Sequence, residues 1–207
     1  MTMTPRFIYF DLGRVLVDFD AKAMIQNIAS AASVSGEAVR KAIFDDGVIY
    51  DLERGDCTSD EAFDRFRRST GTPCTQAALQ GAACEAFELR LDMMPVIASL
   101  RMSNFPCGIL SNTSSWHWEY CRRSYPGLLD RMNVYALSYE LHCAKPEPEI
   151  YRKAASAAGV TPEEIFFTDD MPLNVEAAQE AGFDAVVFRG GRALAKELRR
   201  RDVRLNC

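Results

Sequence analysis

The stretch Phe7-Ile8-Tyr9-Phe10-Asp11-Leu12-Gly13, near the start of the chain, joins a short apolar run directly to a carboxylate. Consecutive apolar and aromatic side chains predict a strand that is buried on both faces, because a half-exposed strand alternates apolar with polar residues. Strands of this kind occur in parallel sheets enclosed between layers of helices. The stretch therefore predicts an α/β fold whose first strand, residues 7–10, ends at Asp11.

Similar runs recur along the rest of the chain, and helical patterns follow most of them. The further strands that we expect are Cys107–Leu110, Val134–Leu137, Ile165–Thr168 and Ala185–Phe188. The helices expected between them are Ser114–Ser124, Pro148–Ala158 and Leu173–Ala181. The last two run into Gly159 and Gly182, which suit a left-handed helix end. Alternating strands and helices predict a doubly wound, Rossmann-like three-layer core with a parallel sheet.

One segment, between Asp18 and about Asp92, departs from this alternation, since it has helical periodicity and no convincing strand. The helices expected there are Ala21–Ala32, Gly36–Phe44, Ser59–Ser69 and Gln76–Leu89. Thr58 and Glu61 have the spacing of a capping box at the start of the third. We therefore predict a core formed by residues 1–17 and 92–207 and an inserted all-helical domain at residues 18–91.

The overall composition excludes several classes of protein. The 24 Lys and Arg against 29 Asp and Glu give a net charge of −5, which argues against a nucleic-acid partner. No apolar stretch approaches the ~18 residues of a membrane span. The first residues lack the features of a signal peptide, so we expect a cytoplasmic protein. The seven cysteines form no CxxC pair, which favours reduced thiols over a disulfide framework or a zinc site. No feature of the sequence specifies an oligomeric state.

Polar residues follow several of the expected strands. In an open α/β sheet, ligands bind beyond the carboxyl ends of the strands. Each residue alone has an ordinary explanation as a turn, cap or loop residue. Together they would bring three carboxylates, a hydroxyl and an ammonium to one edge of the sheet. These residues are Asp11, Ser111-Asn112-Thr113, Lys145 and Asp169-Asp170.

The same segments resemble, in order and in kind, the four motifs of the haloacid dehalogenase superfamily. The resemblance spans nearly the whole chain, and the helical insertion lies where one class of cap domain is inserted in that superfamily. In detail the motifs are similar to those of bacterial alpha-D-glucose-1-phosphate phosphatases and of the N-terminal phosphatase domain of soluble epoxide hydrolase. The segments are Phe10–Leu16, Ile109–Asn112, Lys145–Tyr151 and Phe166–Asp170.

This resemblance implies a Mg²⁺-dependent phosphatase that acts on a small phosphorylated metabolite, such as a sugar phosphate. By resemblance Asp11 is the nucleophile, and it forms an aspartyl-phosphate that water hydrolyses. Mg²⁺ would be held by Asp11, the backbone carbonyl of Gly13 and Asp170. Asp169 aligns with a position that usually holds a metal-bound water, so it belongs to the metal site through that water.

The remaining motif residues would act on the phosphoryl group. The resemblance implies that Ser111 and the backbone amide of Asn112 bind the transferring phosphoryl oxygens. Lys145 would neutralise Asp11 and the phosphoryl group, which lowers the cost of crowding negative charge. We expect Asn174, four positions after Asp170, to fix that loop.

Position 13 departs from the pattern of the superfamily. Most phosphatases of this kind carry a second Asp two positions after the nucleophile, which acts as general acid and then as general base. Here that position is Gly13, and loss of such a group costs about 10²–10⁴ in rate. We therefore expect rates to depend steeply on leaving-group acidity, unless Asp18, Asp20 or a cap residue supplies the proton. Asp18 and Asp20 are better explained as turn residues.

Two other functions remain as alternatives. A 2-haloacid dehalogenase would use Asp11 to attack carbon without a metal, but the pair Asp169-Asp170 would then put uncompensated charge beside the nucleophile. A weakly catalytic binding or regulatory module would explain Gly13, although it would not require both Asp11 and Lys145. Aromatic residues after the second motif, which we expect mainly to pack, could instead line a substrate pocket: Trp116, His117, Trp118 and Tyr120.

Overall fold

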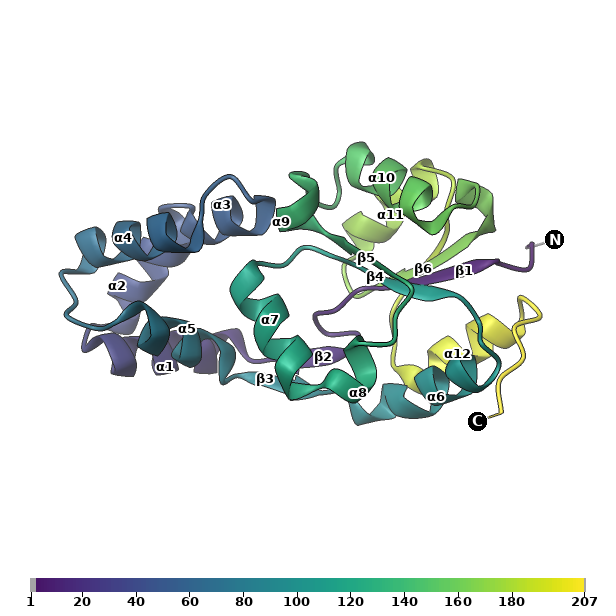
Figure 1. Cartoon of the computed structure of the whole chain (residues 1–207), viewed down its shortest axis with the longest axis horizontal. Coiled ribbons are helices and arrows are strands. Elements are labelled where there is room, and N and C mark those ends of the chain that lie inside the picture. The colour runs from purple at the N-terminus through teal and green to yellow at the C-terminus, as the bar shows by residue number, and fades with distance from the viewer. Residues whose placement is uncertain (1–2, 207) are drawn as a thin grey trace.

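The central element of the fold is a five-stranded parallel sheet in the order β5-β4-β1-β6-β7 (Figure 1). The computed structural model describes residues 3–206; residues 1–2 and Cys207, which the predicted core also includes, lie outside the described residues. All five predicted strands are confirmed to within one residue at either end. They are β1 (Phe7–Phe10), β4 (Cys107–Ser111), β5 (Val134–Leu137), β6 (Ile165–Asp169) and β7 (Asp184–Val187).

Helices cover both faces of this sheet, which explains the continuous apolar runs. Ile8 and Phe10 of β1 join the apolar cluster on one face, whereas Phe7 and Tyr9 join the cluster on the other. The first face is covered by α6 (Met94–Met102), α7 (Ser115–Ser124), α8 (Pro126–Leu129) and α12 (Gly191–Arg199). The second is covered by α10 (Pro148–Ala158) and α11 (Pro172–Glu180). The predicted Rossmann-like three-layer core is confirmed, and so are the helices expected between its strands.

A helical block, residues 21–84, lies at one end of the molecule and packs around its own apolar cluster, which includes Met24, Ile28, Phe66 and Leu79 (Figure 1). The capping box between Thr58 and Glu61 is present as predicted. The block contains α1 (Ala21–Ala32), α2 (Gly36–Arg40), a π-helical turn (Lys41–Asp45), α3 (Val48–Arg54), α4 (Ser59–Thr70) and α5 (Gln76–Cys84).

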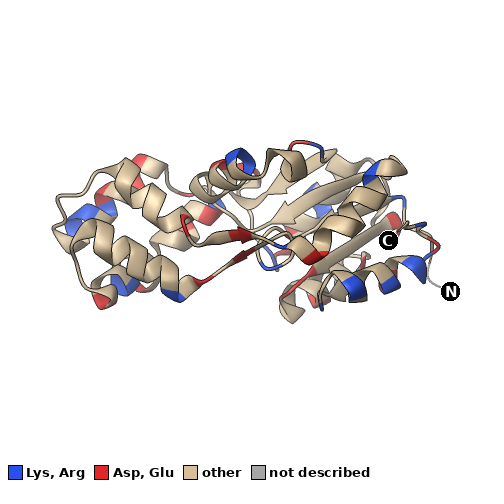
Figure 2. Cartoon of the chain, turned by 90° about the horizontal axis from the view of Figure 1, so that it is seen from below, with Lys and Arg blue, Asp and Glu red and all other residues tan. Residues whose placement is uncertain are grey.

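A two-stranded antiparallel ribbon connects this block to the core, where the sequence predicted no strand (Figure 2). It consists of β2 (Val17–Phe19) and β3 (Phe87–Leu89), in which Phe19 pairs with Phe87. The prediction of a helix over Gln76–Leu89 is therefore wrong beyond Cys84, where the helix ends. Helix α3 was not predicted. Strands of three residues are too short to show a period of two, so their pairing depends on a partner about seventy positions away.

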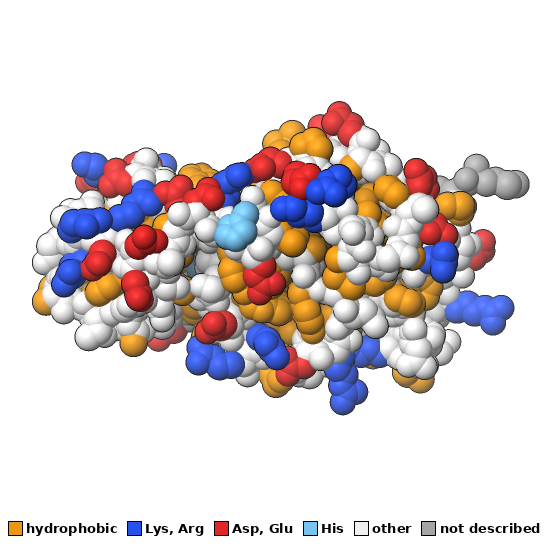
Figure 3. Space-filling view, turned by 45° about the horizontal axis from the view of Figure 1, so that its top comes forward, with side chains coloured by type: hydrophobic (Ala, Val, Ile, Leu, Met, Phe, Trp, Pro, Cys, Tyr) orange, Lys and Arg blue, Asp and Glu red, His pale blue; other side chains and the backbone are white. Residues whose placement is uncertain are grey.

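On the face shown in Figure 3, acidic and basic side chains intermingle, and hydrophobic side chains gather over its middle. Among residues 3–206, no helix combines the length and apolar character that crossing a bilayer requires.

Candidate active site

The predicted site residues meet at the carboxyl edge of the sheet. Asp11 follows β1, Ser111 ends β4, and Asp169 ends β6, so neighbouring parallel strands deliver all three to the same place. Lys145 enters from the loop between α9 (Ser138–Leu141) and α10. Carboxylate oxygens of Asp11, Asp169 and Asp170 lie within 4.8 Å of one another. The structure therefore brings together the acidic cluster and the ammonium that the sequence suggested.

Lys145 is the buried cation of this cluster, with a side chain that is only 1 % exposed. Its Nζ lies 2.9 Å from Oδ1 of Asp11, donates to Oδ2 of Asp169, and lies 3.0 Å from the carbonyl oxygen of Leu110. An ammonium has three N–H donors, and here each has an acceptor. Lys145 is therefore held in place, and one positive charge compensates two buried carboxylates.

Asp11 is buried beside this ammonium. Its Oδ1 also accepts a hydrogen bond of 2.7 Å from the backbone amide of Leu12. Burial raises the pKa of Asp11 to about 6, and the charge of Asp169 adds to this effect. Lys145 and the Ser111 hydroxyl act in the opposite direction, because both stabilise the carboxylate. The nearby cation thus partly offsets the cost of holding a carboxylate away from water.

Asp169 and Asp170 differ in their surroundings. Asp169 is fully buried, and besides Lys145 it accepts from the Met171 amide at 2.8 Å and from the side chain of Asn174 at 3.1 Å. Asn174 therefore fixes this loop, as expected. Asp170 is partly exposed and lies 3.5 Å from Arg14. Partial burial and the charge of Asp169 raise the pKa of Asp170.

These contacts indicate how the acidic cluster would fit a hard divalent cation. Both oxygens of Asp169 already accept hydrogen bonds from protein donors. Asp170 is the more exposed member of the cluster, and only Oδ1 of Asp11 is held by the Leu12 amide and Lys145. Carboxylate oxygens at this spacing are the ligand type that Mg²⁺ takes. The donor set therefore fits a cation bound directly by Asp11 and Asp170. Asp169 would not bind the cation directly, because its oxygens already accept hydrogen bonds from the protein.

Asn112 has a positioning function that the sequence did not suggest. Its Nδ2 donates to the carbonyl of Lys145 at 2.8 Å, and its Oδ1 accepts from the Lys145 amide at 2.7 Å. Two hydrogen bonds to one backbone unit hold the Lys145 loop against the end of β4. Ser111 is buried next to Asp11, in agreement with the predicted position of its hydroxyl.

Gly13 faces a cavity of about 180 Å³ between the core and the helical block. Its φ lies outside the left-handed region, and a Cβ there would stand 3.4 Å from the ring of Phe19, an ordinary contact. Neither nearby acid replaces the missing one: Asp18 pairs with Arg90, and Asp20 caps α1. Asp20 is a turn residue, as the sequence favoured, whereas Asp18 lies in strand β2, where it pairs with Glu88 of β3.

Side chains from both parts of the molecule line the same cavity. Ser111 and Asn112 line it from the core, while Ile49 and Glu53 of α3 line it from the helical block. The sequence did not single out Glu53, because nothing local shows which face of α3 turns inward.

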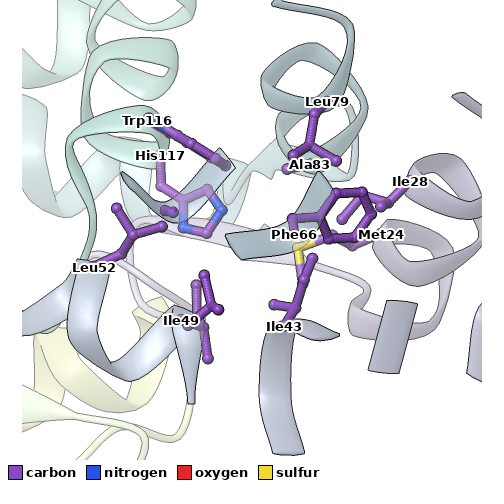
Figure 4. Close-up of a pocket in the computed structure, with 12 residues that line it drawn as sticks. Met24, Ile28, Ile43, Ile49, Leu52, Phe66, Leu79, Ala83, Trp116 and His117 are labelled. Atoms are coloured by element: carbon purple, nitrogen blue, oxygen red, sulfur yellow. The ribbon is translucent and has the colours of Figure 1, made fainter. Parts of the chain in front are cut away.

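Of the aromatic residues after the second motif, His117 lines this cavity, and Trp116 and His117 both line a second, smaller pocket, as the alternative in the sequence suggested. His117 of α7 lines the cavity and also reaches a small apolar pocket inside the helical block, among Ile49 and Leu52 (Figure 4). Its ring packs on Phe87, with ring centroids 5.0 Å apart. Burial lowers the pKa of His117 to about 4, so its imidazole is neutral near pH 7. Trp118 packs in the core, as expected.

Comparisons with known proteins agree with this geometry. A family model described as hydrolase, haloacid dehalogenase-like hydrolase, matches residues 10–182. D-ribitol-5-phosphate phosphatase of Bacteroides thetaiotaomicron is 29 % identical over 202 residues, covering 92 % of this chain and 95 % of that protein.

Solved structures extend the comparison. A haloacid dehalogenase family enzyme from Bacteroides thetaiotaomicron, in complex with magnesium and inorganic phosphate, superposes with a TM-score of 0.78 at 28 % identity, covering 90 % of this chain and 96 % of that one. An L-2-haloacid dehalogenase from Xanthobacter autotrophicus shares the fold, with a TM-score of 0.64 at 20 % identity over 95 % of this chain and 83 % of that one.

Proposed function

The chain belongs to the haloacid dehalogenase-like hydrolases, and from that membership and the geometry of its site we propose that it is a Mg²⁺-dependent phosphatase of small phosphorylated metabolites. The observation that carries the proposal is the contact of 2.9 Å between Lys145 and buried Asp11, beside Asp169 and Asp170. A carboxylate that is buried, paired with an ammonium and next to further acids suits attack on a phosphate ester.

Asp11 is the proposed nucleophile. Its Oδ1 is held by Lys145 and the Leu12 amide, so the orientation of the carboxylate is fixed before it attacks phosphorus. The P–O bond to the alcohol breaks as the aspartyl-phosphate forms, and water then releases phosphate and restores the carboxylate. Lys145 compensates the charge of the Asp11 carboxylate before attack, which lowers the repulsion that an incoming phosphate would meet.

The phosphoryl oxygens are assigned to donors at the end of β4. The Ser111 hydroxyl and the backbone amide of Asn112 would bind them. The side chain of Asn112 forms hydrogen bonds with the backbone of Lys145, so it is the backbone N–H of Asn112 that we assign to the phosphoryl group. Preorganised donors of this kind stabilise charge that develops during transfer.

Mg²⁺ would be held by Asp11, Asp170 and the carbonyl oxygen of Gly13, with Asp169 acting through a bound water. When bound, it supplies the positive charge that lets a phosphate dianion approach a carboxylate. The structure of the Bacteroides enzyme with magnesium and phosphate supports this assignment by analogy.

The acidic cluster favours a phosphatase over the alternatives. A dehalogenase would keep Asp169 and Asp170 beside Asp11, with buried Lys145 and half-exposed Arg14 as the cations near three carboxylates, and a metal-free reaction does not need so many acids. A binding module would not require a buried nucleophile and ammonium in contact. The relative named D-ribitol-5-phosphate phosphatase supports a sugar or polyol phosphate as substrate.

The helical block is the proposed cap over this site, with the domain limits at residues 18–91 and the core at residues 1–17 and 92–207. The cavity between the two parts would receive the leaving group, and its lining would determine substrate preference.

A panel of phosphorylated metabolites, assayed by phosphate release with and without Mg²⁺, tests the proposal. We expect turnover of at least one small phosphate ester with Mg²⁺, lost in excess chelator and in Asp11→Asn. Turnover that persists in folded Asp11→Asn would contradict the assignment of the nucleophile.

A further inference from the structure

We propose that Glu53 of α3 is the general acid and general base of the reaction. It would replace the Asp that most related phosphatases carry at the position of Gly13. This inference rests on the proposed phosphatase function. It identifies a catalytic residue that is contributed by the helical block and not by the loop after β1.

The position of Glu53 in the cavity carries the inference. Glu53 is half-buried and lines the same cavity as Gly13, Ser111 and Asn112, from the opposite wall. The charged and titratable groups that face it are Asp11, Lys145 and the neutral imidazole of His117. The remaining lining is mostly apolar. Among the residues that line the cavity, Glu53 is the one with an acidic side chain. A leaving group in the cavity would lie beside Glu53, Ser111 and Asn112, which all line it.

The two residues after Glu53 hold it in this position. Arg54 forms an ion pair with Glu147, in the same loop as Lys145. Gly55 packs so closely on α9 that a Cβ there would stand 2.2 Å from the carbonyl oxygen of Tyr139, and its φ is +72°. Only glycine tolerates both conditions. The end of α3 therefore contacts the core at two points, Tyr139 before Lys145 in the sequence and Glu147 after it.

The other candidates for proton transfer either form contacts outside the cavity or lack a proton to donate at neutral pH. Asp18 pairs with Arg90, and Asp20 accepts from the first amides of α1. His117 is neutral near pH 7 and cannot act as a strong acid there.

The electrostatics of Glu53 agree with proton transfer. Burial raises the pKa of Glu53 to about 7, and the charge of Asp11 adds to this effect while Lys145 opposes it. A carboxyl group with such a pKa is partly protonated at neutral pH, as an acid catalyst requires.

The proposed proton transfers balance over the whole cycle. In the first step Asp11 attacks phosphorus, the P–O bond to the leaving group breaks, and the departing oxygen takes the proton of Glu53. In the second step the Glu53 carboxylate takes a proton from the water that attacks the aspartyl-phosphate. Phosphate leaves, Asp11 is restored as a carboxylate, and Glu53 is again protonated.

A leaving-group series tests this assignment in the full-length protein. For wild type we expect log kcat/KM to change little with leaving-group pKa, in place of the steep dependence expected if no acid replaced the missing one. Glu53→Gln should lose about 10²–10⁴-fold with phosphates of primary alcohols. It should lose less than about tenfold with para-nitrophenyl phosphate and acyl phosphates, whose leaving groups need little proton assistance.

The pH profile gives a second readout. With alkyl phosphates, wild-type kcat/KM, which reports the phosphorylation step, should fall as the pH rises through about 7, because the acid form of Glu53 is lost. Glu53→Gln should lack this decline. Glu85→Gln, an exposed carboxylate at the end of α5, is the matched control and should keep both the rates and the profile.

A rescue variant keeps the test decisive. The space at position 13 accepts a side chain, so Gly13→Asp in the Glu53→Gln background should recover at least about tenfold with alkyl phosphates. Equal losses of kcat/KM across all leaving groups, an unchanged pH profile of kcat/KM or unchanged rates in Glu53→Gln would overturn the inference. The proposed phosphatase function would still stand if wild type hydrolyses the esters and Asp11→Asn does not.

Discussion

Lys145 Nζ lies 2.9 Å from Asp11 Oδ1 and also donates to Asp169, so one buried ammonium serves two buried carboxylates. Such an arrangement is costly to form, because all three groups leave water. It is costlier still to break, because removal of one partner leaves charge without compensation. Removal of any one of these groups should therefore lower stability as well as activity.

Lys145→Met should reduce both stability and activity. We expect a loss of about 3–5 kcal/mol in the free energy of unfolding near pH 7, since Asp11 and Asp169 stay buried without their cation. Urea denaturation measures this loss. Lys22→Met, an exposed lysine in the first turn of α1, is the control and should change stability by less than about 1 kcal/mol. Equal small effects of the two substitutions would contradict the charge-compensation role of Lys145.

Asp170→Asn should weaken Mg²⁺ binding while the fold is kept, because Asp170 is the more exposed acid of the cluster. The Mg²⁺ concentration that gives half-maximal activity should rise at least about tenfold. Mg²⁺ should also raise the melting temperature of wild type more than that of the variant, a readout independent of turnover. Asp130→Asn, an exposed acid paired with Arg122, serves as control. Identical Mg²⁺ dependence in wild type and Asp170→Asn would remove Asp170 from the metal site.

His117 should make the protein less stable in mild acid. Its pKa is lowered from 6.5 to about 4 in the folded state by burial. Below pH 6.5 the unfolded chain therefore binds a proton that the folded chain does not, and stability falls as the pH decreases towards 4. We expect His117 to account for a fall of about 2 kcal/mol over this range.

The comparison with His117→Phe isolates this effect, because the carboxyl groups that titrate in the same range are present in both proteins. Unfolding free energies from urea denaturation at several pH values provide the measurement. The variant should show a shallower decline than wild type. Parallel curves would mean that folding does not change the pKa of His117.

The sheet and most of the site were predictable because their signals are local. Continuous apolar runs marked β1 and β4 to β7, and parallel strands necessarily bring the residues at their carboxyl ends to one edge. This is why Asp11, Ser111 and Asp169 could be expected to meet although they are far apart in the chain.

The features that were missed depend on contacts between distant segments. The ribbon of β2 and β3 exists because two three-residue segments pair across the helical block. Glu53 faces the cavity because Arg54 and Gly55 dock α3 on the core, which helical periodicity alone does not show. The engagement of the Asn112 side chain with the Lys145 backbone likewise appears only once both loops are placed.

The central claim, that Asp11 carries the phosphoryl group, is tested most directly by rapid acid quench during turnover followed by peptide mass spectrometry. We predict that the peptide containing Asp11 gains the mass of one phosphoryl group, that hydroxylamine removes it, and that Asp11→Asn never acquires it. Quenched wild type in full turnover without phosphorylated Asp11, or with the phosphoryl group on another residue, would contradict the account.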